Sequence, residues 1–343
     1  MTNTNNNPRA PSASLSILTV AIAATLSACG GGGGGGTPAA TSAPVAPVVL
    51  ASTLATTVLP TTYSGEQATA FNLINAERNR CGFGVVAQDL NLDAAAASHA
   101  AYTPQSTITG EDLHSEVPGR AGFTGVTPTD RAIAKGYAGT ASEVMGVGTG
   151  TTAVRGLLSA PYHLRGLLDG YRDIGIGMAP SSIPDLPYFV ADVGTKNGAG
   201  LQQLASNDVV TYPCNGTTGV NYQLRGETPN PVPGRNLSTN PIGTPILVKV
   251  RDGNVLTITN AAMVNVSTGA GVVLRAPVGA SNDPNRVNGV AYFKASEAYV
   301  APDAPLTAGT TYQVTVTGTN NGVAIGKDGK GLTFSFTTGT GIN

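Results

Sequence analysis

The chain has 343 residues and a formal net charge of −1, with 11% charged residues, 45 glycines and no tryptophan. Because no basic or acidic block interrupts this near-balance, the composition excludes a nucleic-acid-binding protein of the basic kind and a strongly charged partner. The length is sufficient for two domains after a leader and a linker.

The N-terminal segment predicts export and a lipid anchor. Residues 13–28 form an uncharged apolar run. This run is shorter than the roughly 20 residues of a transmembrane helix and is typical of an export signal. The sequence Leu-Ser-Ala-Cys at 26–29 resembles the bacterial lipoprotein box. That resemblance implies a signal peptide over 1–28, acylation of Cys29 and a place at the cell envelope, on the outer membrane or cell surface. An ordinary secretory signal with an incidental cysteine is the alternative.

Residues 29–60 are rich in Gly, Pro and Ala and show no periodicity, so they predict a flexible linker. If Cys29 is acylated, Cys81 and Cys214 remain. Outside the cytoplasm an even remainder favours a disulfide. Two buried free thiols are the alternative.

Helix signals come next along the chain. Periodic apolar residues predict helices over 66–80 and 92–102, and a further one over 152–159. Between them, Thr127 is a predicted N-cap and Gly136 a predicted terminator of another helix.

Strand signals follow the helices. Residues 173–179 alternate isoleucine with glycine, and residues 187–194 are rich in β-forming side chains. Since helices come first and strands cluster late, the pattern predicts an α+β domain rather than alternating βαβ units.

An ordered set of short motifs carries a family resemblance. These are LINAERNRCG, LNLDAAAASHA, an isolated histidine at 114, DRAIAKGY, SEVMG, SAPYHLRGLL and DIGIGMA. The set resembles the CAP superfamily of extracellular SCP-like domains and covers about residues 65–195. The resemblance implies a three-layer α-β-α sandwich over 61–225 and an extracytoplasmic setting.

The resemblance also implies a central cleft. His114, Glu143 and His163 match the family's cleft residues. Two imidazoles and a carboxylate are a recognisable ligand set for zinc or another divalent cation, and without metal they can form a polar cluster. The tryptophan and second glutamate that the family places before the second histidine are missing. Glu116 or Asp169 is a possible substitute for that glutamate.

Neighbouring residues receive a structural interpretation. His99 lies on the buried face of the predicted 92–102 helix, which predicts a structural role. Arg131 is expected to pair with Asp130 or Glu143. The glycine-rich residues 146–156 lack the Lys-Ser/Thr ending of a phosphate loop, and no nucleophile elbow occurs.

The last third of the chain predicts a second domain. Residues 226–240 are rich in Pro, Gly and Asn and predict a hinge. Beyond it the apolar period becomes two, and Asp252-Gly253 is a hairpin signal. Residues 241–343 predict an all-β sandwich whose closing strands resemble bacterial Ig-like modules.

Three function hypotheses follow. The first is a lipid-anchored envelope protein whose CAP-like domain binds a lipid, glycan or protein ligand. The second is a metal-assisted hydrolase in which Glu143 acts as general base on a water held by His114 and His163. The third is a structural or adhesive surface module.

Overall fold

The computed structural model describes residues 50–105, 113–181 and 185–341. The predicted signal peptide, Cys29 and residues 29–49 of the predicted linker lie outside the described residues. The described residues, which begin at Leu50, belong to one compact unit. Across the described ranges, no helix is both long enough and apolar enough to cross a membrane.

The described end of the predicted linker, residues 50–60, is attached to the folded chain. The backbone N–H of Thr53 donates to the carbonyl of Gln203 at 2.9 Å, and the N–H of Val85 donates to Ala55 at 2.9 Å. This part is therefore not a free tether, because tertiary hydrogen bonds hold it.

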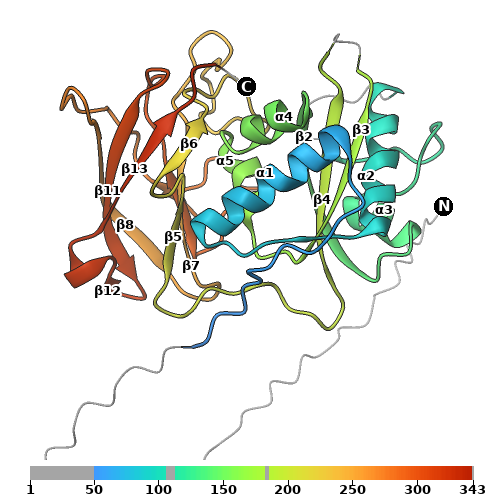
Figure 1. Cartoon of the computed structure of the whole chain (residues 1–343), viewed down its shortest axis with the longest axis horizontal. Coiled ribbons are helices and arrows are strands. Elements are labelled where there is room, and N and C mark those ends of the chain that lie inside the picture. The colour runs from blue at the N-terminus through green and yellow to red at the C-terminus, as the bar shows by residue number, and fades with distance from the viewer. Residues whose placement is uncertain (1–49, 106–112, 182–184, 342–343) are drawn as a thin grey trace, which may run out of the picture. The chain divides into compact units, whose positions relative to one another are not determined.

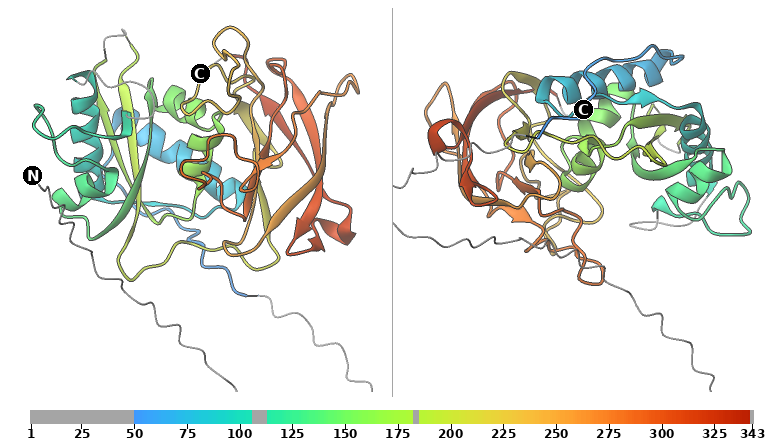
Figure 2. Two further views of the ribbon diagram at one scale, coloured as in Figure 1. Left: turned by 180° about the vertical axis from the view of Figure 1, so that it is seen from behind. Right: turned by 90° about the horizontal axis from the view of Figure 1, so that it is seen from below.

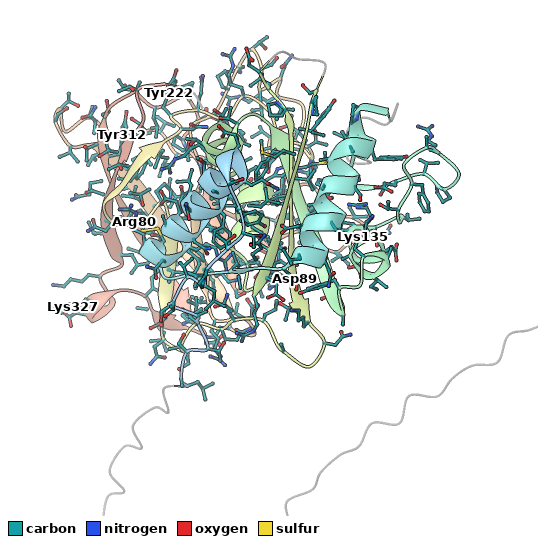
Figure 3. The ribbon with its side chains drawn as sticks, turned by 45° about the vertical axis from the view of Figure 1, so that its right-hand side comes forward. Arg80, Asp89, Lys135, Tyr222, Tyr312 and Lys327 are labelled. Atoms are coloured by element: carbon teal, nitrogen blue, oxygen red, sulfur yellow. A yellow bond between two sulfur atoms is a disulfide. The ribbon has the colours of Figure 1, made fainter. Side chains whose placement is uncertain are left out.

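The helices of this half are α1 (Gly65–Cys81), α2 (Leu90–Tyr102), η1 (Thr103–Gln105), α3 (Pro128–Ala134), α4 (Gly150–Leu157) and α5 (Pro161–Leu168). Helices α1 to α4 begin and end close to the predicted positions, whereas the sequence pattern does not predict α5 or η1. At α3, Thr127 and Asp130 form a capping box, which confirms the predicted start. Asp89, labelled in Figure 3, caps α2 by accepting hydrogen bonds from the N–H groups of Asn91 and Leu92.

The first sheet has the order β1-β3-β4-β2. Its strands are β1 (Ala87–Gln88), β2 (Gly139–Val147), β3 (Asp173–Ala179) and β4 (Tyr188–Lys196). β4 is antiparallel to both β3 and β2, so β2 forms one edge of the sheet. The sequence pattern predicts no strand over 139–147, because these residues include few β-branched or aromatic side chains and owe their conformation to pairing with β4.

Helices cover both faces of this sheet (Figures 1 and 2). On one face, Gly175 and Gly177 leave no room for a side chain against the α2 backbone, so α2 packs closely on β3. On the other face, Ile174 and Ile176 share a buried cluster with Phe71 of α1. This half of the molecule is therefore α+β, as the sequence predicts.

The remaining strands form two further sheets. They are β5 (Val209–Tyr212), β6 (Thr217–Val220), β7 (Ile246–Val250), β8 (Leu256–Asn265), β9 (Val278–Gly279), β10 (Glu297–Val300), β11 (Thr311–Asn320), β12 (Val323–Ala324) and β13 (Leu332–Thr338), with the short helix η3 (Lys327–Gly329). One sheet has the order β5-β7-β10-β9, and the other β12-β11-β13-β6 with β8 also paired to β11. Val248 of the first and Val314 and Phe336 of the second belong to one buried cluster, so the sheets face each other.

Two expectations are corrected here. The Asp252-Gly253 turn does not close a hairpin, because β7 pairs with β5 and β10 whereas β8 pairs with β11. The predicted domain boundary at 225 also cuts through shared sheets, since β5 and β6 precede it and pair with β7 and β13. One apolar cluster spans both halves, joining Leu167 to Leu247 and Tyr299.

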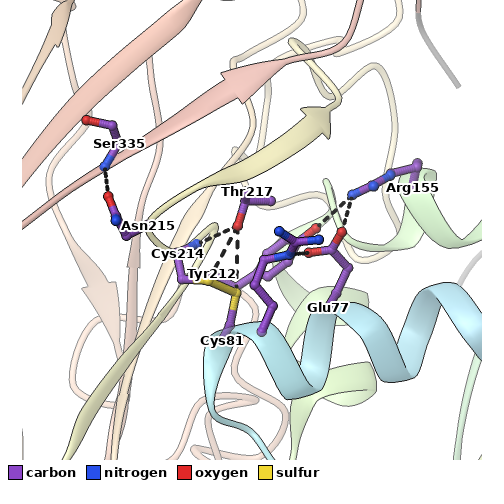
Figure 4. Close-up of a disulfide and its surroundings, with 9 residues drawn as sticks. Glu77, Cys81, Arg155, Tyr212, Cys214, Asn215, Thr217 and Ser335 are labelled. Carbon is purple, nitrogen blue, oxygen red and sulfur yellow. Dashed lines mark hydrogen bonds and ion pairs between the residues drawn. A yellow bond between two sulfur atoms is a disulfide. The ribbon is translucent and has the colours of Figure 1, made fainter.

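The predicted disulfide between Cys81 and Cys214 is present (Figure 4). It joins the end of α1 to the turn between β5 and β6, and its two Cα atoms are 5.5 Å apart. Beside it, Arg155 of α4 pairs with Glu77 of α1 at 3.0 Å. The bridge therefore links the helical half to the C-terminal sheets.

Candidate functional site

The structure brings His114 and His163 together. His114 lies in the connection between α2 and α3, and His163 lies in the first turn of α5. Their ring centroids are 6.1 Å apart. Both rings are partly exposed, with 33% of the His114 side chain and 14% of the His163 side chain accessible. The two imidazoles therefore face accessible space from elements far apart in the sequence.

Glu143, on β2, contacts the His114 ring from its buried side. Its Oε1 lies 2.7 Å from Nδ1 of His114, and its Oε2 accepts a hydrogen bond from Arg131 at 2.6 Å. Of the two predicted partners of Arg131, Glu143 is therefore the one that it contacts. Burial acts to raise the pKa of Glu143, but the His114 hydrogen bond and the Arg131 charge outweigh it and lower that pKa. Glu143 is thus a buried, ionised orienting group.

Asp192 lies opposite Glu143 in the pairing of β2 with β4. Its carboxyl is fully buried, and within the described chain neither oxygen has a hydrogen-bond partner. Burial, followed by the nearby charge of Glu143, raises the pKa of Asp192 well above its ordinary value. The two carboxyls therefore differ in charge state because Glu143 directly contacts Arg131 and His114, whereas burial is the largest effect at Asp192.

Glu227 holds His163 in the same manner, and no sequence motif identified it. Its Oε1 lies 3.0 Å from Nδ1 of His163 and accepts the backbone N–H groups of Tyr162 and His163. Burial raises the pKa of Glu227, and the His163 contacts act against this rise. Glu227 lies in the predicted hinge, where no local pattern distinguishes it from a solvated loop residue.

The substitutes considered for the second acid are located elsewhere. Glu116 lies 3.0 Å from Nδ1 of His99 and accepts the backbone N–H of Thr124. The other ring nitrogen of His99 lies 2.9 Å from the carbonyl of Leu113, next to His114. His99 is buried within the fold, in agreement with its predicted structural role.

Asp169 belongs to a buried ion-pair network. It pairs with Lys249 of β7 at 3.0 Å and with Lys294 at 2.9 Å. Asp169, Asp252 and Glu297 together have the spacing of a cation site. Each of these carboxylates already contacts a lysine, and with Arg165 the network has three cations for three anions. Its charges are thus mutually satisfied.

Two cavities meet at the imidazole pair. The larger has a volume of about 580 Å³ and is lined by His114 and His163 together with Met145–Val147, parts of α4 and residues 221–228. The smaller, of about 250 Å³, shares both histidines and continues along residues 142–144. We call the two cavities together the β2 groove. Its size is that of small-ligand and peptide sites.

The predicted metal-ligand set does not present three ligands to one point. Both carboxylate oxygens of Glu143 are engaged by His114 and Arg131, and its side chain has no exposed area. Within the described ranges, these residues do not form a group of three metal-ligating atoms. The three residues therefore do not fit a metal ion that all of them would hold.

The remaining chemistry lies in the Nε2 atoms. In each imidazole, Nδ1 faces a carboxylate and so carries a proton. Nε2 has no hydrogen-bond partner in the part of the chain that the structure describes, in either ring. Each ring thus presents an oriented Nε2 that accepts a hydrogen bond when neutral and donates one when protonated.

Comparisons with known proteins add little to this geometry. No protein-family model matches the chain, and no curated protein matches it. Among solved structures, it is similar to an outer surface protein from Borrelia burgdorferi, with 19% identity and a TM-score of 0.32. The match covers 38% of this chain and 93% of that one. A likeness of this extent assigns neither a family nor an activity.

Proposed function

We propose that the protein is a CAP-like ligand-binding protein of the cell envelope, with the β2 groove as its binding site. One observation carries the proposal. Two imidazoles from distant segments line one groove, and a buried carboxylate fixes each ring through Nδ1. Fixed rings whose Nε2 atoms have no partner among the described residues form a preorganised recognition element.

The same geometry argues against Glu143 as the general base of a hydrolase. A general base must reach the proton that it abstracts. Glu143 and Glu227 both have side chains without exposed area, behind the rings that they orient. The groove also has apolar walls, including Leu157, Leu224 and Val147, which suit a ligand with apolar groups.

The cellular setting is part of the proposal. A lipid anchor at Cys29 would place the folded chain at the membrane surface of a bacterial envelope. The Cys81–Cys214 bridge supports an oxidising compartment, because structural disulfides persist there. Metabolic labelling with a palmitate analogue tests the anchor: Cys29→Ser should abolish the label and release the protein from the membrane fraction.

The binding role is tested with a defined panel of probes. Phosphatidylethanolamine vesicles, a peptidoglycan disaccharide and a capped peptide library represent lipid, glycan and protein ligands. We expect one class to bind, and His114→Gln with His163→Gln to weaken that binding at least about tenfold. Lys327→Gln, at an exposed residue of η3, is the matched control. Binding that the double variant leaves unchanged would exclude the groove as the site.

A metal-dependent role is the second candidate. Carboxylate–imidazole pairs like those of His114 and His163 also support metal-bound histidines. Titration with Zn²⁺, followed by calorimetry, separates the two roles. Stoichiometric binding that is lost in both histidine variants would favour the metal role, whereas the absence of heat would leave direct ligand recognition.

A further inference from the structure

On the edge strand β2, backbone groups without a hydrogen bond among the described residues face the groove. Ala141 directs both its N–H and its carbonyl away from β4, because both contact the hydroxyl of Thr129. Its partner Gly194 directs its carbonyl toward the β3 side, where it accepts from Arg172. The direction of the backbone N–H and carbonyl groups alternates from one residue to the next along an antiparallel strand. The backbone groups of Glu143, Met145 and Val147 therefore also point away from β4.

These three residues lie along the two cavities. Glu143 lines the smaller cavity, and Met145 and Val147 line the larger one. Glu143 is 8% exposed as a residue although its side chain is 0% exposed, so its backbone is the part that reaches the cavity. In the described chain, none of the three has a hydrogen bond on its outward backbone N–H or carbonyl. The groove therefore contains a row of alternating donors and acceptors.

The other walls leave room for a strand beside β2. His114 and His163 line both cavities, α4 and α5 form a second wall, and residues 221–229 form a third. The six β2 residues along the groove span roughly 20 Å at about 3.4 Å per residue. An extended segment of about six residues matches this length.

We infer that the ligand of the groove is an extended polypeptide segment that adds to the first sheet as a strand beside β2. This inference rests on the proposed function and names its ligand class. A peptide main chain has the same two-residue repeat of N–H and carbonyl groups as the strand edge. A lipid chain would leave the outward groups of Glu143, Met145 and Val147 buried without partners, which is unfavourable. A glycan lacks the two-residue repeat of N–H and carbonyl groups that would pair with the strand edge.

The imidazoles and the walls then contribute sequence preference. Because His114 and His163 line both cavities, each Nε2 would be within reach of the segment and could hydrogen-bond a polar side chain or carbonyl. At the Val147 end, Leu157 and Leu224 surround the larger cavity and favour an apolar side chain. Alternate side chains of the bound segment would therefore meet different environments.

The test uses capped decapeptides. The tightest binder from a displayed random library is resynthesised with a single N-methyl group at each position in turn, and its affinity for the whole folded protein is measured by fluorescence polarisation. We expect N-methylation to weaken binding at least about tenfold at every second residue and by less than about twofold at the residues between. Equal effects at all positions, or none, would overturn strand addition.

A variant of the edge provides a second readout. Val147→Pro removes an outward N–H without removing a bond to β4, and Pro is tolerated at strand edges. It should weaken peptide binding at least about tenfold, whereas Val147→Ala, which keeps the N–H, should retain most of it. Equal affinities of the two variants for the peptide would overturn the inference.

The vesicles and the disaccharide distinguish this inference from the proposed function. If either binds in a His163-dependent manner while no library peptide binds, the polypeptide ligand is excluded and the binding role of the groove stands. If neither these probes nor any peptide binds, both proposals fall.

Discussion

At the scale of single residues, the site is defined by carboxyls in contrasting environments. Glu143 is surrounded by His114 and Arg131 and keeps its charge. Asp192 is its direct cross-strand neighbour, and neither of its carboxyl oxygens has a hydrogen-bond partner among the described residues. Two like charges at this depth would repel strongly, so the structure stabilises one charged and one neutral carboxyl.

This contrast predicts a pH dependence. In the unfolded chain Asp192 ionises near pH 4, whereas its folded pKa is raised. Its contribution to stability is therefore full below about pH 4 and is lost as the pH rises through the folded pKa. The asparagine of the Asp192→Asn variant cannot ionise. The free energy of unfolding of the variant, relative to that of the wild type, should therefore increase by on the order of 2 kcal/mol between pH 4 and pH 7.

Urea denaturation at pH 4, 5.5 and 7 measures this difference. Asp208→Asn, at an exposed position, is the control and should follow the wild type at every pH. If the free energy of unfolding of the Asp192→Asn variant changed with pH in the same way as that of the wild type, a raised pKa at Asp192 would be contradicted.

At the scale of elements, α5 is attached to the C-terminal sheets by ionic contacts. β7 is buried along its whole length, so Lys249 is buried together with the apolar residues of this strand. The ammonium contacts Glu297 at 2.6 Å and Asp169 at 3.0 Å. Lys249 thus faces α5 in the interior, because β7 is covered on both faces.

Removing this lysine should be costly. Lys249→Met leaves Asp169 and Glu297 buried with fewer cations, and we expect a loss of about 3–5 kcal/mol in the free energy of unfolding. Lys294→Met is the matched control, since its side chain is 31% exposed and its loss should be about 1 kcal/mol or less. Equal losses in urea denaturation would show that burial does not distinguish the two lysines.

The same network predicts that acid destabilises the fold. Burial acts to raise the pKa of Asp169, but Lys249, Arg165 and Lys294 outweigh it and lower that pKa far below the ordinary value. The stabilisation from Asp169 is therefore complete above about pH 4 and is lost as the pH falls toward the folded pKa. This dependence is opposite in sign to that of Asp192.

At the scale of the whole molecule, the two halves share sheets, a core and the site. β5 and β6 pair with strands beyond the predicted hinge. Glu227, from the hinge segment, orients His163 of the helical half. The groove is therefore complete only when both halves are present.

A truncated chain tests this interdependence. A fragment of residues 50–225 lacks Glu227 and the partners of β5 and β6, so we expect no cooperative thermal transition by circular dichroism. Residues 50–341 should unfold in one transition. A cooperative transition of the short fragment at the temperature of the longer one would instead support two independent domains.

The sequence by itself determined the features that depend on neighbouring residues. The N-cap at Thr127, the strands β3 and β4 and the pairing of the two remaining cysteines could all be predicted. Local hydrogen bonds and side-chain periodicity involve residues that are close in the sequence, so they can be predicted from the sequence alone. His114, Glu143 and His163 were identified through the ordered motifs rather than through any physical signal of proximity.

Only the tertiary structure decided the rest. Glu227 meets His163 across 64 residues of chain, Lys249 meets Asp169 across 80, and β2 becomes a strand because β4 pairs with it. Such contacts form only when segments far apart in the sequence are brought together by the tertiary fold. The identity of one residue does not indicate which distant residue it will contact. For the same reason the unpaired edge of β2 could not be read from the sequence, because an edge is a property of the whole sheet.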